Sequence, residues 1–140
     1  MLHLRFSNVH ADIPIATWAD AVLRITGDFE IETDGKLYHE QEFCLVELAY
    51  QLHRWLTTFH LSELDFEYAS METDDNPLLW FRRGRVGWTV GARHQDKPNP
   101  AEVNEAELVA AVTAYLVELD ATLVDILDVR LLPVLLDVGR

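Results

Sequence analysis

The sequence predicts an α+β fold in which an antiparallel sheet of five or six strands carries two helices on one face. Several short segments alternate apolar and polar side chains with a period of two, as strands do when one face is buried. Two longer segments place apolar residues at helical spacing instead. The predicted order along the 140 residues is β-β-β-α-β-β-β-α, which suits a sheet with its helices gathered on one side.

The first half of the chain predicts three strands. Residues 2–9 alternate apolar and polar side chains, and residues 18–33 contain a longer alternating run. One parity of that run is apolar and the other polar, so one face of the strand should be buried. Asp34-Gly35 favours a type I′ turn, which needs positive φ at both central positions. Residues 36–43 should therefore return antiparallel to the second strand.

The pattern changes to helical spacing at Cys44. Apolar residues recur three and four positions apart through residue 59, which predicts a helix of about four turns. Cys44 is the one cysteine of the chain, so no intramolecular disulfide can form. At the start of an apolar helix we expect a buried, unreactive thiol. A reducing cytoplasm is the simplest compartment for such a protein.

The second half predicts three further strands and a second helix. Residues 64–68, 78–82 and 86–90 alternate apolar and polar side chains, and the last two runs should form a hairpin. Asn104 can cap a helix, with Glu107 three residues later as in a capping box. Apolar residues then follow at helical spacing, and every apolar parity should face the helices.

Length and composition predict one domain over residues 1–140, because 49% of the residues are apolar and a core of ordinary size can form. Residues 129–140 form an unusually apolar tail that could dock on this chain or on a second copy, which leaves a homo-oligomer open. We see no signal peptide at the amino terminus. No apolar run approaches the ~18 residues needed to cross a bilayer.

The charge balance is strongly acidic. Asp and Glu number 24 against 11 Lys and Arg, which gives a net charge of −13. Such a field repels nucleic acid and anionic membranes and attracts basic partners. We therefore expect a basic protein partner, and neither a nucleic acid nor a membrane. The alternative is that the acidity serves solubility alone.

No pattern in the sequence predicts a metal, a cofactor or a catalytic nucleophile. The six histidines lack metal-ligand spacing, and no C-x-x-C motif occurs. Glu47, on the first predicted helix, is the acid best placed for a semi-buried role, and an apolar pocket would raise the pKa of a catalytic acid. The alternative is a helix-surface residue paired with Arg54 or bonded to Tyr68.

The acidic residues are concentrated in one segment, where six occur within thirteen residues. These six, which we predict to form a partner-binding surface, are Glu63, Asp65, Glu67, Glu72, Asp74 and Asp75. Side chains at a spacing of two lie ~7 Å apart along a strand, close to the phosphate repeat of a nucleic-acid strand. A second alternating run comprises Asp28, Glu30, Glu32 and Asp34. The alternative is a solvated sheet face whose repulsion salt screens.

Tryptophans and basic residues also gather in places. The four tryptophans could anchor an interface or lie at the edge of the core; they are Trp18, Trp55, Trp80 and Trp88. Five of the basic residues predict a modest basic strip; they are Arg82, Arg83, Arg85, Arg93 and Lys97.

The order of these elements carries a family resemblance over residues 6–119. A β-rich start precedes a Glu-bearing helix that ends in a tryptophan segment, residues 44–56. The strand Phe66-Glu-Tyr-Ala-Ser70 then leads into Met71-Glu72, and an apolar hairpin containing Gly-Trp and a carboxy-terminal helix follow. In this the chain resembles the Wap-type immunity proteins of contact-dependent toxin systems. The resemblance implies a stoichiometric protein inhibitor rather than an enzyme.

Three functions are therefore open. The first is a cytoplasmic immunity protein or antitoxin whose acidic face imitates nucleic-acid phosphates and blocks a basic toxin. The second is a small enzyme that uses a carboxylate in a pocket between sheet and helices. The third is a homo-oligomeric structural module that associates through the apolar tail.

Overall fold

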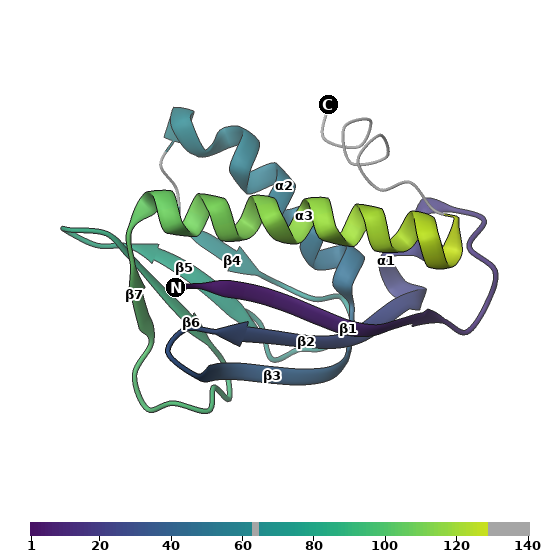
Figure 1. Cartoon of the computed structure of the whole chain (residues 1–140), viewed down its shortest axis with the longest axis horizontal. Coiled ribbons are helices and arrows are strands. Elements are labelled where there is room, and N and C mark those ends of the chain that lie inside the picture. The colour runs from purple at the N-terminus through teal and green to yellow at the C-terminus, as the bar shows by residue number, and fades with distance from the viewer. Residues whose placement is uncertain (63–64, 129–140) are drawn as a thin grey trace.

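The computed structural model describes residues 1–62 and 65–128, without the side chains of residues 59–62. This part of the chain has the predicted α+β class (Figure 1). The single sheet with two helices is wrong in detail. The described residues form two antiparallel sheets, of three and four strands, and three helices in the order β1-α1-β2-β3-α2-β4-β5-β6-β7-α3.

The first sheet has the order β1-β2-β3, with β1 at His3–Ala11, β2 at Ile25–Glu32 and β3 at Lys36–Phe43. The predicted turn between β2 and β3 is confirmed, because Asp34 and Gly35 have φ of 49° and 110°. The inner face of this sheet contributes fully buried apolar side chains, among them Phe29.

The predicted strand over residues 18–33 is wrong in its first part, where α1 spans Trp18–Arg24. A complete capping box begins this helix. The Thr17 hydroxyl accepts from the Asp20 N–H at 3.1 Å, and the Asp20 carboxylate accepts from the Thr17 N–H at 3.2 Å. These bonds satisfy amide donors at the helix start. The local sequence therefore favours a short helix that ends where β2 begins.

The second sheet has the order β4-β5-β6-β7. Its strands are β4 at Phe66–Tyr68, β5 at Leu79–Arg83, β6 at Trp88–Ala92 and β7 at Ala101–Val103. The predicted β5–β6 hairpin is confirmed. Val86, predicted to face the helices, instead lies in the turn and is 98% exposed. The edge strand β7 was not predicted, because three residues are too few to show a period.

Two long helices complete the core. The helix predicted after Cys44 is α2, at Leu45–Ser62, and α3 runs over Glu105–Leu127. α3 lies along β1, and α2 passes behind it against both sheets (Figure 1). Trp55 of α2 is 6% exposed and packs against Phe66, Phe81 and Trp88, so it joins the helix to the second sheet.

The loop after β6 fastens the two sheets together. Lys97 donates from Nζ to the carbonyl oxygens of Thr33 and Asp34, at 2.9 and 3.0 Å. The Asp96 N–H donates to the carbonyl of Leu37 on β3. The apolar tail, residues 129–140, lies outside the described residues. Among the helices that are described, none is long and apolar enough to cross a membrane.

Candidate functional site

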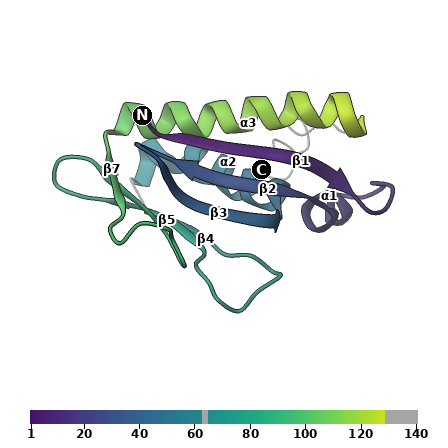
Figure 2. The ribbon, with the colours of Figure 1, turned by 60° about the horizontal axis from the view of Figure 1, so that its bottom comes forward.

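The segment between β4 and β5, residues 69–78, carries three of the predicted partner-binding acids. Figure 2 shows this loop projecting from the sheets on the side away from α3. Two side chains of α2 hold its first residues. Gln51 exchanges two hydrogen bonds with the backbone of Ala69, at 2.8 and 3.1 Å. Glu47 accepts from the Met71 N–H at 3.1 Å.

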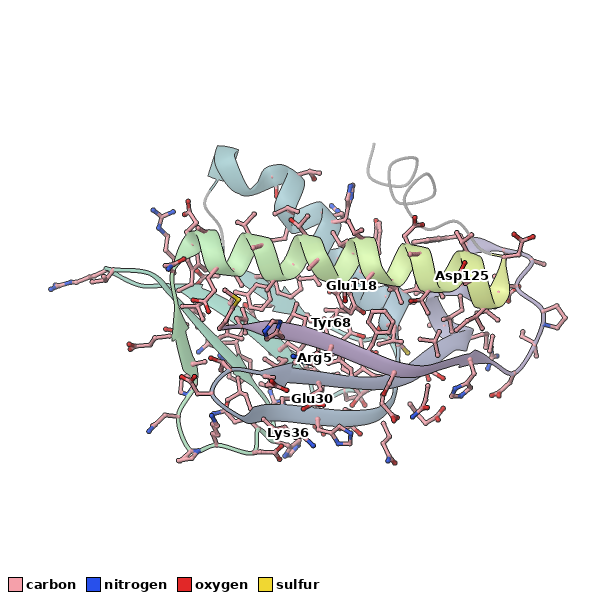
Figure 3. All side chains as sticks on the ribbon, viewed as in Figure 1. Arg5, Glu30, Lys36, Tyr68, Glu118 and Asp125 are labelled. Carbon is pink, nitrogen blue, oxygen red and sulfur yellow. The ribbon has the colours of Figure 1, made fainter. Side chains whose placement is uncertain are left out.

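Glu47 is 3% exposed, and its second oxygen accepts from the Tyr68 hydroxyl at 2.7 Å. The bond to Tyr68 therefore takes the place of a pairing with Arg54. A buried carboxylate needs such donors to offset its lost hydration. Burial, followed by the bond to Glu47, raises the pKa of Tyr68 far above its ordinary value. Tyr68 lies within the body of the molecule (Figure 3), so Glu47 is tied to the core as well as to the loop.

The rest of the loop is ordered from within. The Asn76 amide accepts from the Ser70 N–H and donates to the carbonyls of Ser70 and Thr73, at 2.9 to 3.0 Å. Arg93 adds a bond from its guanidinium to the Asn76 carbonyl. These contacts fix the loop's backbone while its carboxylates at Glu72, Asp74 and Asp75 stay exposed.

A cleft of about 390 Å³ lies between this loop and β3. Carboxylates from both sides line it: Glu40 and Glu42 from β3, and Glu72 and Asp75 from the loop. His94 is the basic side chain on its rim, and no Lys or Arg is among the described residues that line it. The cleft is thus bounded by four acids.

A β-bulge shapes the β3 side of the cleft. β2 pairs Gly27 with Phe43 and Phe29 with Glu40, so β3 has one residue more than β2 in this stretch. Glu42 lies inside it with φ of 52°. Bulges of this kind redirect side chains at the edges of sheets. Sequence reasoning missed Glu40 and Glu42 because it grouped acids by their closeness along the chain.

The floor of the cleft contains Tyr38, Phe43 and Cys44, all buried. Burial raises the pKa of the Cys44 thiol to about 11, with smaller contributions from the nearby Glu47 and Glu72. A thiol with that pKa is a poor nucleophile at neutral pH. The prediction of a buried, unreactive cysteine therefore agrees with the structure.

The structure divides the six predicted acids. Glu63 lies outside the described residues. Asp65 immediately precedes β4 and Glu67 lies on it, and both are exposed. Asp65 accepts from the Arg83 N–H at 2.9 Å, which occupies one of its oxygens. Glu72, Asp74 and Asp75 follow the other end of β4, so the loop acids form a group separate from the strand acids.

Basic residues lie on the strand next to the strand acids. Glu67 pairs in register with Trp80, and the Arg82 guanidinium lies 4.8 Å from the centre of the Trp80 ring. Two acids of the second predicted run, Glu30 and Glu32 on β2, have Arg5 as a neighbour. Arg5 lies 3.5 Å from Glu32 and pairs in register with Glu30 on the neighbouring strand (Figure 3). The loop acids Glu72, Asp74 and Asp75 have no such cation beside them among the described residues.

The basic strip does not form a single surface. Arg93 holds the acidic loop, and Lys97 holds the β2–β3 turn. Arg85 lies at the β5–β6 turn, where another cleft, of about 500 Å³, reaches Glu107 at the start of α3. Within residues 1–62 and 65–128, no three or more His, Cys, Asp or Glu side chains are grouped to hold a metal ion.

The comparison with protein families covers nearly all of this structure. Residues 2–125 match a family model described as Domain of unknown function (DUF7878). No curated protein and no solved structure gives a significant match. The matched range includes both sheets, α1, α2, nearly all of α3 and the acidic loop with its cleft. The chain belongs to the DUF7878 family of domains.

Proposed function

We propose that this protein binds a basic protein partner through the acidic loop and the adjoining cleft, as an immunity protein or antitoxin would. The observation that carries the proposal is an ordered backbone that presents uncompensated carboxylates. Glu72, Asp74 and Asp75 are exposed, and none has an ion pair within the described chain. A fixed array of acids favours fast, selective capture of a basic surface.

Order in the unbound loop supports this role. A loop that is already fixed loses little conformational entropy on binding, so more of the interaction energy appears as affinity. The bonds from Glu47, Gln51 and Asn76 do this fixing. We place the protein in the cytoplasm, where the free thiol of Cys44 would persist.

The test is co-expression with the protein encoded beside this chain in its genome, with cell survival as the readout. Glu72→Gln, Asp74→Asn and Asp75→Asn together should abolish protection. The control is the pair Glu118→Gln and Asp125→Asn, two exposed acids on α3 (Figure 3). We expect the control to protect like the wild type.

Binding of the purified proteins should weaken as salt rises, because exposed charges are screened within ~8 Å at physiological ionic strength. Equal protection by the loop variant and the wild type would overturn the proposal. A neighbouring protein that is neither toxic nor bound would overturn it as well. Asp65→Lys together with Glu67→Lys tests the strand acids separately, and we expect a smaller loss of protection from that pair.

A further inference from the structure

We infer that the cleft between β3 and the acidic loop is a pocket for a guanidinium group, and that a single arginine side chain of the partner enters it. The inference rests on the proposed function for its biological setting. It has its own structural basis, which is a deeply buried tyrosine whose hydroxyl has no hydrogen-bond partner among the described residues and which lines a cleft walled by acids.

That group is the hydroxyl of Tyr38. Its side chain is 3% exposed and lines the cleft. In the described part of the chain no hydrogen bond reaches it, and His53 Nδ1 is the one buried side-chain nitrogen or oxygen that lacks both a partner and solvent. The Tyr38 oxygen therefore still meets solvent, and the cleft that its side chain lines supplies the opening. A tyrosine buried this deeply usually pairs its hydroxyl with another protein group, so a hydroxyl left open to a cleft offers an acceptor and a donor to a ligand.

The charges around the cleft fix the sign of that ligand. Glu40 and Glu42 face it from β3, and Glu72 and Asp75 face it from the loop. Glu42 is the one with a neighbouring base, since His10 Nε2 lies 3.3 Å from its carboxylate. His94 is on the rim. The balance is negative, which favours a cationic ligand.

The form of the cleft favours guanidinium over a metal ion. The described side chains provide no cluster of three or more acids, histidines or cysteines that could ligate a metal. Phe43 and Leu78 supply apolar wall, against which the aliphatic stem of arginine can pack. The planar head offers five donors, enough for carboxylates on two sides and for the Tyr38 oxygen. It is also more weakly hydrated than the ammonium of lysine.

The test is an NMR titration of the whole chain with N-acetyl-arginine amide. We expect saturable shifts at the amides of Tyr38, Phe43 and Cys44. N-acetyl-citrulline amide, which has the same shape without the charge, should give none. Glu40→Gln with Glu72→Gln should raise the apparent Kd by at least about tenfold, because two charged acceptors are lost. The matched pair Glu118→Gln and Asp125→Asn should leave it unchanged.

Tyr38→Phe distinguishes a contact with the Tyr38 hydroxyl from general attraction to the carboxylates, because it changes no charge. A Kd about threefold or more weaker in this variant supports a contact with the hydroxyl. Equal shifts with the citrulline probe, or equal Kd values in the cleft pair and the α3 pair, would overturn the pocket. In that case the loop acids could still protect cells, and the proposed function would stand. Conversely, the arginine probe could bind in the cleft while the loop variant protects cells as well as the wild type. In that case the pocket would stand and the proposed function would fail.

Discussion

Removing the Tyr68 hydroxyl tests whether α2 holds the acidic loop through a buried charged acceptor. Tyr68 is 1% exposed, Glu47 is 3% exposed, and their oxygens lie 2.7 Å apart. Tyr68→Phe keeps the ring and deletes one donor to a buried carboxylate. Hydrogen bonds to charged groups contribute about 1.5–3 kcal/mol, so we expect the free energy of unfolding to fall by about 2–3 kcal/mol. At roughly 4 °C per kcal/mol for this length, Tm should fall by ~8–12 °C.

Urea unfolding followed by tryptophan fluorescence measures the loss, and Tyr38→Phe is the matched control. Tyr38 is buried in the same core, but its hydroxyl has no hydrogen-bond partner among the described residues. Its removal should change stability by less than about 0.5 kcal/mol. Hydrogen exchange at Met71, whose amide donates to Glu47, should also quicken in Tyr68→Phe. Equal losses in the two variants would refute the argument that Glu47 depends on this donor.

Three further predictions concern the first sheet and its neighbours. Cys44, whose pKa burial raises to about 11, should not react with a thiol reagent at neutral pH until the protein is unfolded; rapid labelling of the native state would contradict this. Gly27→Ala should lower the free energy of unfolding by about 1–3 kcal/mol in urea, because the new carbon would lie 2.7 Å from a carbonyl oxygen of β1. The carbonyl of Asn8 and, to a smaller extent, Glu42 raise the pKa of the exposed His10. Its contribution to stability is thus present below the unfolded pKa and is lost as the pH rises through the folded pKa. Glu42→Gln should lower the His10 pKa in an NMR titration. An unchanged pKa would show that Glu42 does not contribute to the shift.

Local patterns predicted the elements whose signals are local. The alternation in β2, the turn that leads into β3 and the apolar stripe of α2 all depend on side chains a few positions apart. Asn104 caps α3 as predicted, since its side chain accepts from the Glu107 N–H at 2.8 Å. The reciprocal half of that capping box was not found, because Glu107 instead accepts from the N–H of Leu2, 105 positions away. A partner so distant in sequence has no local signature.

The same contrast between short and long separation in sequence explains which residues of the candidate site were predicted. Counting along the chain found the loop acids, because Glu72, Asp74 and Asp75 are neighbours in sequence. It could not show that β3 brings Glu40 and Glu42 to the same cleft, since that depends on a bulge and on how the two sheets are joined. The division of one sheet into two was hidden for a similar reason. Strand patterns show which face is buried and do not show which strands pair.

In the acidic loop, repulsion between carboxylates is opposed by hydrogen bonds to the core. Carboxylates as close as Asp74 and Asp75 repel one another, and an unconstrained loop would spread to relieve that repulsion. Here the backbone is held at one end by Glu47 and Gln51 of α2 and at the other by Arg93. Folding energy from the core therefore keeps the charges together in the free protein. A basic partner would relieve the repulsion without having to order the loop. If the fastening bonds serve binding in this way, Tyr68→Phe should slow capture of the partner at temperatures where the protein is still folded, and stability and association rate should fall together.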